Sequence, residues 1–333
     1  MGEEANYPIA FIHADILDAF LRVNHNQTAE ARPFLERGFA ALAKESPEGF
    51  LFLAVPNILR PVCAEALRFG IEPQLVHSMV HAFRAWSVTF RCFGHFEGHV
   101  NGISLSYSEK SKGEQVIKLL AANAPKPVPL ATVTQLIWGE ASESTLHVTL
   151  SRLRKTLGST VFQIEHSKLS LSPSLCWLDT TALDHELTQL EKSITHNTLT
   201  ETNAIKPIHR VLELYRGDVL SEGSNDMRWL RPLREHWKKR ITSLFDKIIK
   251  ILSPQGQHNL IAQLQSAVER TPHNETLTMA LMSVSLYMHR YAEGFTIYQN
   301  YCQIAPATSM SSDTKALAQQ LKTAYESSSF PTL

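Results

Sequence analysis

The sequence predicts a mainly α-helical protein with a small β contribution near its centre. Leu and Ala recur at the three- and four-residue spacing of amphipathic helices through both ends of the chain. Between residues 87 and 105 the pattern changes to strand-like alternation, and it contains Asn101-Gly102, the strongest short signal for a β-hairpin. A chain of 333 residues is long enough for two or three domains.

These changes of pattern divide the chain into four parts. We expect a helical-repeat segment over residues 1–85, a mixed α/β domain over 86–178, a second helical domain over 179–325 and a tail over 326–333. Apolar residues make up 44% of the chain and charged residues 19%, which is enough apolar content for each part to form its own core.

The net charge and the cysteines restrict the class of protein. The 32 Lys and Arg residues balance 32 Asp and Glu residues, so any contact with nucleic acid must come from a local patch. The four cysteines lie far apart and form no C-x-x-C pair: Cys63, Cys92, Cys176 and Cys302. This argues against a zinc site or a disulfide framework and fits a cytoplasmic location. Because no signal-peptide pattern or membrane-length apolar run occurs, we expect no contact with a membrane.

The first segment has a helical pattern from about Phe11 to Arg84. Five prolines are expected to interrupt it: Pro33, Pro47, Pro56, Pro61 and Pro73. We expect one helix over residues 29–43, a Pro-interrupted pair of helices over 50–69 and a capping helix over 73–84. Short amphipathic helices in series cannot bury their faces alone, so they indicate the end of a helical-repeat array. The stretches ARPFLERGFAALAKESPEGFLF and GIEPQLVHSMVHAF resemble the last repeats of the sensor region in MalT-like regulatory ATPases. The resemblance implies a small-molecule or protein effector at these repeats, and an ATPase module that lies upstream in a longer parent protein or has been lost.

Two histidines in this segment have the spacing of helical metal ligands. His77 and His81 are four residues apart, but no third ligand and no intervening acid accompany them. We therefore interpret them as surface histidines of a helix and predict that the chain holds no metal. No motif for a cofactor accompanies them either, so we predict none.

The mixed domain contains two predicted hairpins that flank three helices. Ser111 and Glu114 have the spacing of a capping box, and they open a helix with a predicted core of Val116, Ile117, Leu119 and Leu120. The next helix is short, and its predicted inner residues are Leu130, Val133, Leu136 and Ile137. A third helix spans residues 142–158, and a second hairpin then turns at His166-Ser167. Elements in this order predict a winged helix-turn-helix.

The third helix, SESTLHVTLSRLRKTLG, has two different faces. One face is an apolar stripe with a spacing of four, three and four residues: Leu146, Leu150, Leu153 and Leu157. The opposite face carries hydroxyl groups, one valine and cations, and it has no acidic residue after Glu143. Arg can bind guanine through two hydrogen bonds, Thr and Val methyl groups can contact thymine, and Lys can hold phosphate. A basic surface helix without a ligand is the alternative interpretation.

The tripeptide Leu136-Ile137-Trp138 and the stretch LSRLRKTLG, residues 150–158, resemble the OmpR-type DNA-binding domain. In that family the third helix enters the major groove of DNA, and the hairpin, or wing, contacts the adjacent DNA backbone or the minor groove. The resemblance implies base contacts from Thr145, Val148, Thr149 and Arg152, and a phosphate contact from Arg154. The complete set of predicted DNA-contacting residues is Ser144, Thr145, Val148, Thr149, Arg152, Arg154, Lys155, His166 and Lys168. The sequence departs from the family at the wing, where His166-Ser167-Lys168 replaces the usual Gly-Tyr-Arg.

The remainder of the chain is predicted to be helical to about Tyr325, and two of its stretches have the helix-end residues of tetratricopeptide-type pairs. The stretch LYRGDVL, residues 214–220, together with Trp229, Leu230, Arg234 and Trp237, resembles the bacterial transcriptional activation domain. That domain follows an OmpR-type winged helix in antibiotic-regulatory activators, and the order is the same here. The resemblance implies dimerisation, contact with RNA polymerase, or regulation for this region. We interpret Arg216, Asp218 and Trp229 as structural.

No G-x-x-x-x-G-K-[ST], H-E-x-x-H, G-x-S-x-G or C-x-x-C motif occurs, so we predict that the protein is not an enzyme. The predicted function is sequence-specific regulation of transcription through double-stranded DNA, with activation favoured. Candidate protein partners are RNA polymerase and a second copy of the chain. The alternative is a protein-interaction scaffold or signalling output module whose winged helix does not bind DNA.

Overall fold

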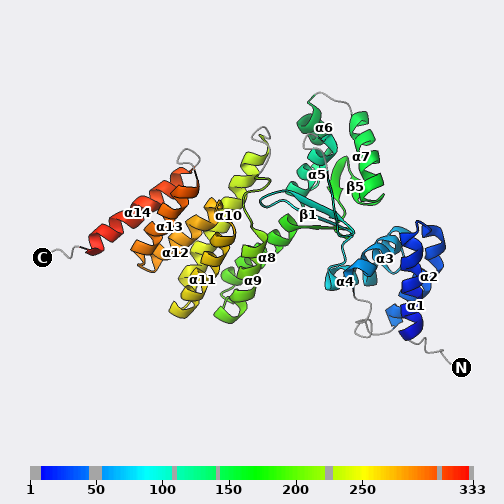
Figure 1. Cartoon of the computed structure of the whole chain (residues 1–333), viewed down its shortest axis with the longest axis horizontal. Coiled ribbons are helices and arrows are strands. Elements are labelled where there is room, and N and C mark those ends of the chain that lie inside the picture. Colours follow the sequence, from blue (N-terminus) through cyan, green and yellow to red (C-terminus); the bar gives the residue numbers. More distant parts are fainter. Residues whose placement is uncertain are drawn as a thin grey trace. The chain divides into compact units, whose positions relative to one another are not determined.

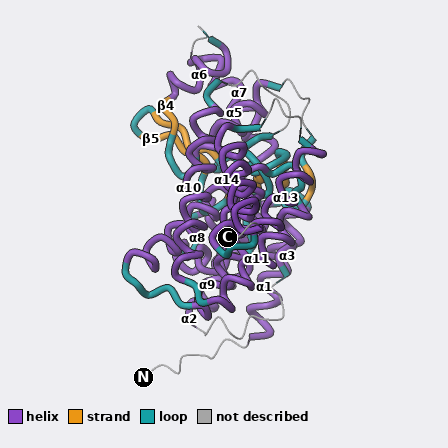
Figure 2. The backbone as a smooth tube through the Cα atoms, turned by 90° about the vertical axis from the view of Figure 1, so that its left-hand side faces the viewer, coloured by secondary structure: helices purple, strands orange, loops and turns teal. Residues whose placement is uncertain are grey.

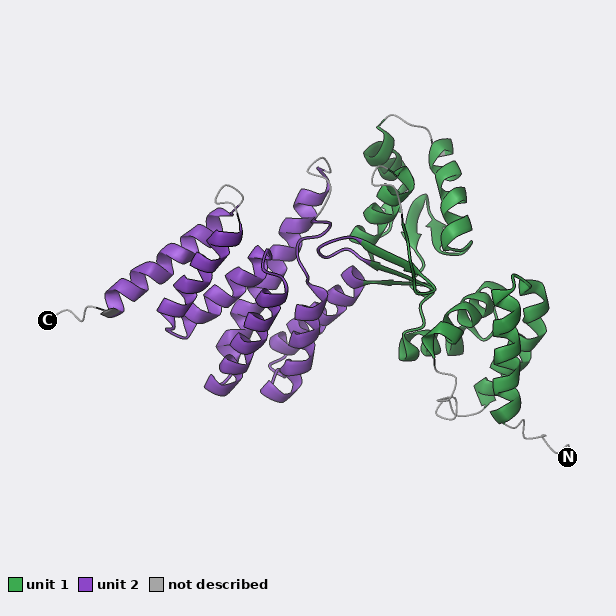
Figure 3. Cartoon of the chain, viewed as in Figure 1, with its two compact units in different colours: residues 1–90, 97–178 green, residues 91–96, 179–333 purple. Residues whose placement is uncertain are grey.

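The computed structural model describes residues 9–44, 55–106, 111–139, 143–221, 228–305 and 310–329. The chain forms two compact units (Figure 3). Unit 1 contains residues 1–90 and 97–178, and unit 2 contains residues 91–96 and 179–333. The chain therefore passes between the units three times, and the short segment 91–96 is part of unit 2 although both of its neighbours belong to unit 1.

Unit 1 begins with four helices: α1 (Ile9–Asn24), α2 (Thr28–Lys44), α3 (Pro56–Phe69) and α4 (Pro73–Phe83). The first hairpin, α1–α2, packs on α3, which pairs with α4 around one buried core. Pro56 and Pro73 open helices, as expected for a residue without a backbone N–H. The single helix predicted over residues 29–43 is confirmed as α2. The expected breaks at Pro33 and Pro61 are wrong, because both prolines lie inside helices within two turns of the start. Pro47 and residues 50–54 of the predicted Pro-interrupted pair lie outside the described residues.

The first sheet of unit 1 has the strand order β3-β2-β1-β7. Its strands are β1 (Val88–Arg91), β2 (Glu97–Val100), β3 (Ile103–Ser104) and β7 (Cys176–Leu178). The predicted hairpin is confirmed for β2 and β3, which pair antiparallel around Asn101 and Gly102 at φ values of 50° and 85°. Strand β1 pairs parallel with β7, with Val88 opposite Cys176. The sequence pattern predicts only antiparallel pairing here, and no local signal indicates this long-range parallel partner.

Three helices and a second sheet complete unit 1 (Figure 1). The helices are α5 (Lys112–Asn123), α6 (Leu130–Trp138) and α7 (Glu143–Leu157), and the sheet joins β4 (Val128–Pro129), β6 (Lys168–Leu171) and β5 (Phe162–Glu165) in that order. This is the arrangement of a winged helix-turn-helix, with β5 and β6 as the hairpin.

Two predictions for α5 and α6 are wrong in detail. The side chain of Ser111 makes no capping hydrogen bond, and Glu114 instead forms an ion pair of 2.7 Å with Lys118 one turn later. The ion pair uses one carboxylate oxygen of Glu114 and draws the side chain away from the helix start, so the reciprocal capping box does not form. Leu136 was expected inside, but its side chain is 42% exposed, because the first turn of α6 and Ile137 already fill the inner face.

Unit 2 is built from seven described helices: α8 (Asp179–Thr195), α9 (Glu201–Leu214), α10 (Leu230–Ile251), α11 (Pro254–Arg270), α12 (Glu275–Tyr287), α13 (Tyr291–Ile304) and α14 (Ser312–Ser329). Neighbours in sequence pack together in the pairs α8–α9, α11–α12, α12–α13 and α13–α14, so unit 2 is a helical-repeat array. Thr200 and Asn203 form a reciprocal capping box at the start of α9, and Asn274 caps α12.

Helices dominate the backbone and strands are confined to a small region (Figure 2), so the predicted fold class is confirmed. Within the described part of the chain, none of the helices combines the length and the apolar content that crossing a bilayer requires.

Candidate nucleic-acid interface

Helix α7 is held in place by its leucine stripe. Leu146 and Leu150 are fully buried, and Leu153 and Leu157 are no more than 5% exposed, as the spacing predicts. Burial of each side chain contributes about 1.5–3 kcal/mol to folding. Leu153 approaches Gly113 of α5 so closely that a Cβ at Gly113 would lie 3.0 Å from Leu153 Cδ2. The stripe therefore fixes α7 against α5 and determines which residues of α7 face outward.

The opposite face of α7 is exposed to solvent. On a helix with 100° between residues, Val148, Arg152 and Lys155 lie within about 60° of one another and opposite the stripe. The exposed fraction of Val148 is 53%. Ser144 is also exposed, and Thr145 is half-buried at the edge. These predicted contact residues are therefore brought together on one accessible surface.

The hydrogen bonds on the exposed face of α7 leave its cations available to an external ligand. In the part of the chain that the structure describes, neither Arg152 nor Lys155 forms an ion pair or a side-chain hydrogen bond. The hydroxyl group of Thr149 donates to the carbonyl of Thr145 at 3.0 Å, which turns its methyl group outward and leaves its oxygen able to accept. Arg154 is half-buried beside the leucine stripe, so it is better placed to contact the DNA backbone than the base edges.

The wing is a tight β-hairpin. Its turn residues His166 and Ser167 have φ values of 49° and 59°, which is the pair of positive angles that a type I′ turn requires. The backbone N–H of Leu130 donates to the carbonyl of Ser167 at 2.9 Å, so the turn is tied to the start of α6. His166 and Lys168 are both exposed, and Lys168 stands directly across the hairpin from Glu165. The carboxylate of Glu165 reduces the positive potential at the wing.

Ile164 is an exposed residue of the wing that the sequence pattern does not predict. Its side chain is 38% exposed on β5, whereas Phe162, on the same face two residues earlier, is buried. Strand alternation alone assigns both residues to the core, because the end of the core along the strand is not visible in the sequence.

Two other cations of the mixed domain are used internally. The ammonium group of Lys112 donates to the carbonyl of Ile137 at 2.6 Å and so satisfies an end group of α6, just before the turn into α7. Lys118 pairs with Glu114. The cations that remain for an external anion on α7 and the wing are therefore Arg152, Arg154, Lys155 and Lys168.

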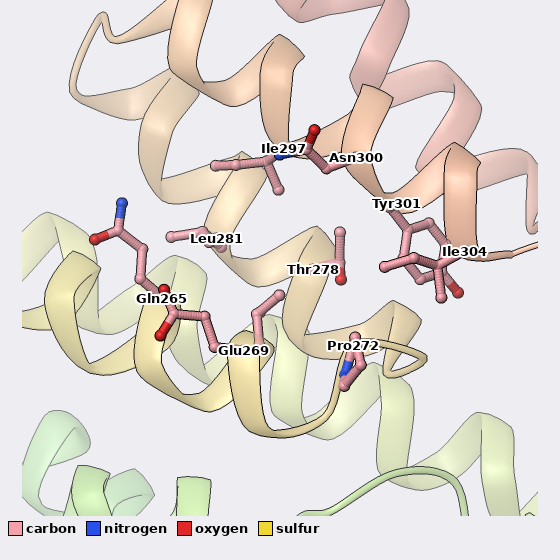
Figure 4. Close-up of a pocket in the computed structure, with 10 residues that line it drawn as sticks. Gln265, Glu269, Pro272, Thr278, Leu281, Ile297, Asn300, Tyr301 and Ile304 are labelled. Atoms are coloured by element: carbon pink, nitrogen blue, oxygen red, sulfur yellow. The ribbon is translucent and has the colours of Figure 1, made fainter.

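Unit 2 contains a shallow apolar groove of about 180 Å³ between α11, α12 and α13 (Figure 4). Its lining includes Leu281, Ile297, Ile304 and Tyr301, with Glu269 as its single carboxylate. Burial raises the pKa of Tyr301 to about 12, so its phenol stays protonated and cannot act as a base near neutral pH. The other polar side chains of its lining are Gln265, Thr278 and Asn300.

The two histidines of α4 show no sign of a metal site. His81 stacks edge-on against Trp86, with 5.2 Å between ring centroids. Among the described residues, no group of three His, Cys, Asp or Glu side chains could hold a metal ion. The absence of metal remains a prediction that needs a direct measurement.

The comparison with protein families concerns unit 2. The family described as "Bacterial transcriptional activator domain" matches residues 178–322. Residues 178–322 are a bacterial transcriptional activator domain. The resemblance based on LYRGDVL and Trp229-Leu230 is thereby confirmed, and the match supports a role in transcriptional activation rather than enzymatic catalysis. The resemblances of the preceding segments to OmpR-type and MalT-like proteins stay predictions.

Several solved structures are similar to the chain at low identity. They include Mycobacterium tuberculosis EmbR in complex with a low-affinity phosphopeptide, with 18% identity, a TM-score of 0.45 and coverage of 73% of this chain and 69% of that chain. The TPR domain of P58(IPK) has 12% identity, a TM-score of 0.28 and coverage of 96% and 66%. The TPR2AB domain of yeast Sti1 in its pHSP90 complex has 10% identity, a TM-score of 0.26 and coverage of 95% and 100%. All three TM-scores lie below 0.5, and we draw no conclusion from them. No curated protein sequence matches the chain significantly.

Proposed function

We propose that the protein is a sequence-specific DNA-binding activator of transcription whose helix α7 reads the major groove. The observation that carries this proposal is the exposed face of α7, where Arg152 and Lys155 have no partner among the described residues and lie beside the exposed methyl groups of Val148. A guanidinium group, methyl groups and hydroxyl groups on one helix face match the donor, acceptor and methyl pattern that base pairs present there. The bacterial transcriptional activator domain that follows in the same chain supports this role.

The wing has a different part in this proposal. A hairpin that follows the third helix can contact the adjacent backbone or minor groove. Lys168 and His166 at its tip are exposed and can approach phosphate groups, which position a protein without selecting the sequence. We therefore assign base selection to Thr145, Val148, Thr149 and Arg152. We assign phosphate contacts to Arg154, Lys155, His166 and Lys168. Ser144 lies at the N-terminal end of α7.

Unit 2 would act after the site has been chosen. We infer that it contacts RNA polymerase or a second copy of the chain, because a helical-repeat array presents a large surface for protein contacts. The N-terminal helices, if they bind an effector, would regulate that step.

The decisive experiment selects fragments of genomic DNA that the purified full-length chain retains at about 0.15 M salt. We expect enrichment of fragments that share one short sequence, and preference for a duplex of that sequence over a scrambled duplex. Equal retention of all fragments, or none, would favour the scaffold alternative in which the winged helix does not bind DNA. The Arg152→Ala variant in the same selection shows whether the enrichment depends on α7.

A further inference from the structure

The segment 91–96 joins two strands of unit 1 but is built into unit 2. Phe93 is fully buried, and its ring centroid lies 5.3 Å from the rings of both Tyr215 and Trp237. The contact with Trp237 is edge-to-face, an arrangement that aromatic pairs favour. Phe93 is therefore a side-chain anchor of the segment in the core of unit 2.

Backbone hydrogen bonds attach the same segment to residues 218–221. The N–H of Leu220 donates to the carbonyl of Cys92 at 2.7 Å, and the N–H of Gly94 donates to the carbonyl of Asp218 at 3.0 Å. The N–H of Ser221 donates to the carbonyl of Gly94 at 2.9 Å. The guanidinium group of Arg234 on α10 in turn donates to the carbonyl of Val219 at 2.8 Å and also to that of Leu220. The segment is thus paired with a strip that α10 itself fixes.

A buried carboxylate completes the attachment. Asp179, the first residue of α8, is 1% exposed and accepts the N–H groups of Cys92 at 2.8 Å and Phe93 at 2.9 Å. Burial raises the pKa of Asp179 to about 6, while these N–H groups and the charge of Arg216 act in the opposite direction. Hydrogen bonds to an ionised acceptor are stronger than neutral ones, and the start of a helix favours negative charge. Above its pKa the carboxylate is ionised, and the hydrogen bonds from the two N–H groups offset part of the cost of burying its charge.

The connectivity gives this attachment a mechanical consequence. The chain crosses between the units after Phe90, after Phe96 and after Leu178. While segment 91–96 is held, all three crossings start or end at fixed residues of unit 2. Release of the segment would leave the crossing from Leu178 to Asp179 as the one that still ends at a fixed residue of unit 2.

We propose that segment 91–96 is a latch that transmits the position of the DNA-reading unit to the activator domain, and that it must be closed for activation but not for DNA binding. The proposal rests on the function proposed above. Loss of α7 would remove both affinity for the DNA site and activation of transcription. Opening of the latch is predicted to remove activation and to leave the affinity unchanged.

The test uses the full chain with Phe93→Ala, which removes the anchor, and Phe93→Leu, which keeps its bulk if the alanine variant folds poorly. Phe295→Ala is the matched control, since Phe295 is a half-buried aromatic residue of unit 2 on α13, outside the latch. Hydrogen exchange followed by mass spectrometry reports the opening of residues 91–96. A duplex titration and a reporter promoter give affinity and activation.

For Phe93→Ala we expect exchange of the 91–96 peptide to accelerate at least tenfold, an affinity within twofold of the native chain, and a several-fold loss of reporter output. For Phe93→Leu, which loses only the ring contacts, we expect smaller changes in exchange and output in the same direction. Unchanged exchange would show that Phe93 does not close a latch, and full activation with accelerated exchange would show that the latch has no role. Equal loss of output in Phe295→Ala would also overturn the proposal, because general weakening of unit 2 would then explain the effect. If the native chain binds no duplex, the proposed function fails, and the exchange data still decide whether the latch exists.

Discussion

Replacement of Arg152 by alanine tests whether the exposed face of α7 reads bases. The side chain is exposed and has no internal partner among the described residues, so the change should alter the free energy of unfolding by no more than about 0.5 kcal/mol. If the guanidinium group binds one guanine through two hydrogen bonds, its loss should cost about 1–3 kcal/mol of binding free energy. That cost corresponds to an affinity lower by a factor of about 5–150. Selectivity should relax at one base pair only.

Lys168→Ala gives the contrasting result. Lys168 lies at the wing, where a lysine can reach a phosphate but not the base edges of the major groove that α7 would occupy. Its removal should weaken binding to matched and scrambled duplexes alike. The slope of log K against log salt should fall by up to about one unit, because one released counterion is lost. The neighbouring Glu165 makes the change smaller than at an isolated lysine.

The assay is a salt titration of each variant on matched and scrambled duplexes, with a melting curve for each. Lys247→Ala and Arg231→Ala are the matched controls, since both residues are exposed on α10 of unit 2. A uniform loss for Arg152→Ala on both duplexes would refute base readout and leave only a phosphate contact. A large fall in melting temperature would refute the structural premise that the residue is free of internal contacts.

Three further predictions concern single groups. Replacement of one thymine of the preferred site by uracil should cost the native chain about 0.8 kcal/mol of binding free energy, the value of one buried methyl-sized group. The Val148→Ala variant should not show this loss. Equal losses in both proteins would exclude Val148 as the residue that contacts the thymine methyl group. The folded-state pKa of Asp179 is raised from 3.8 to about 6, so the folded chain binds this proton more tightly than the unfolded chain. Its contribution to stability should therefore decline as the pH rises from about 4 to 6, by up to about 3 kcal/mol, and Asp179→Asn should abolish the decline in denaturant titrations. Identical pH profiles of the two proteins would contradict this assignment. Finally, protein purified without chelator should contain no stoichiometric zinc, and zinc that disappears in His77→Ala would show that His77 and His81 are ligands.

The sequence by itself determined the features that depend on local pattern. The leucine spacing of α7 predicts which face is buried, because a helix repeats every 3.6 residues whatever it packs against. The Asn101-Gly102 turn was predictable because positive φ angles at two successive residues suit few other dipeptides. The bacterial transcriptional activator domain was recognisable from a short stretch, LYRGDVL, that forms a buried turn. Arg152, Lys155 and Lys168 are exposed, as predicted, whereas Arg154 is half-buried, and the contact of these cations with DNA stays a prediction.

Only the tertiary structure decided the features that join distant residues. The pairing of β1 with β7 brings Val88 beside Cys176, and no periodicity within either strand encodes that partner. The exposure of Leu136 depends on how much of the core remains to be filled by α6. The clearest case is segment 91–96, which has the alternation of a strand but belongs to unit 2. Its place depends on Asp179 and Trp237, which lie more than 80 residues further along the chain, and side-chain burial between such distant residues is a property of the folded core alone.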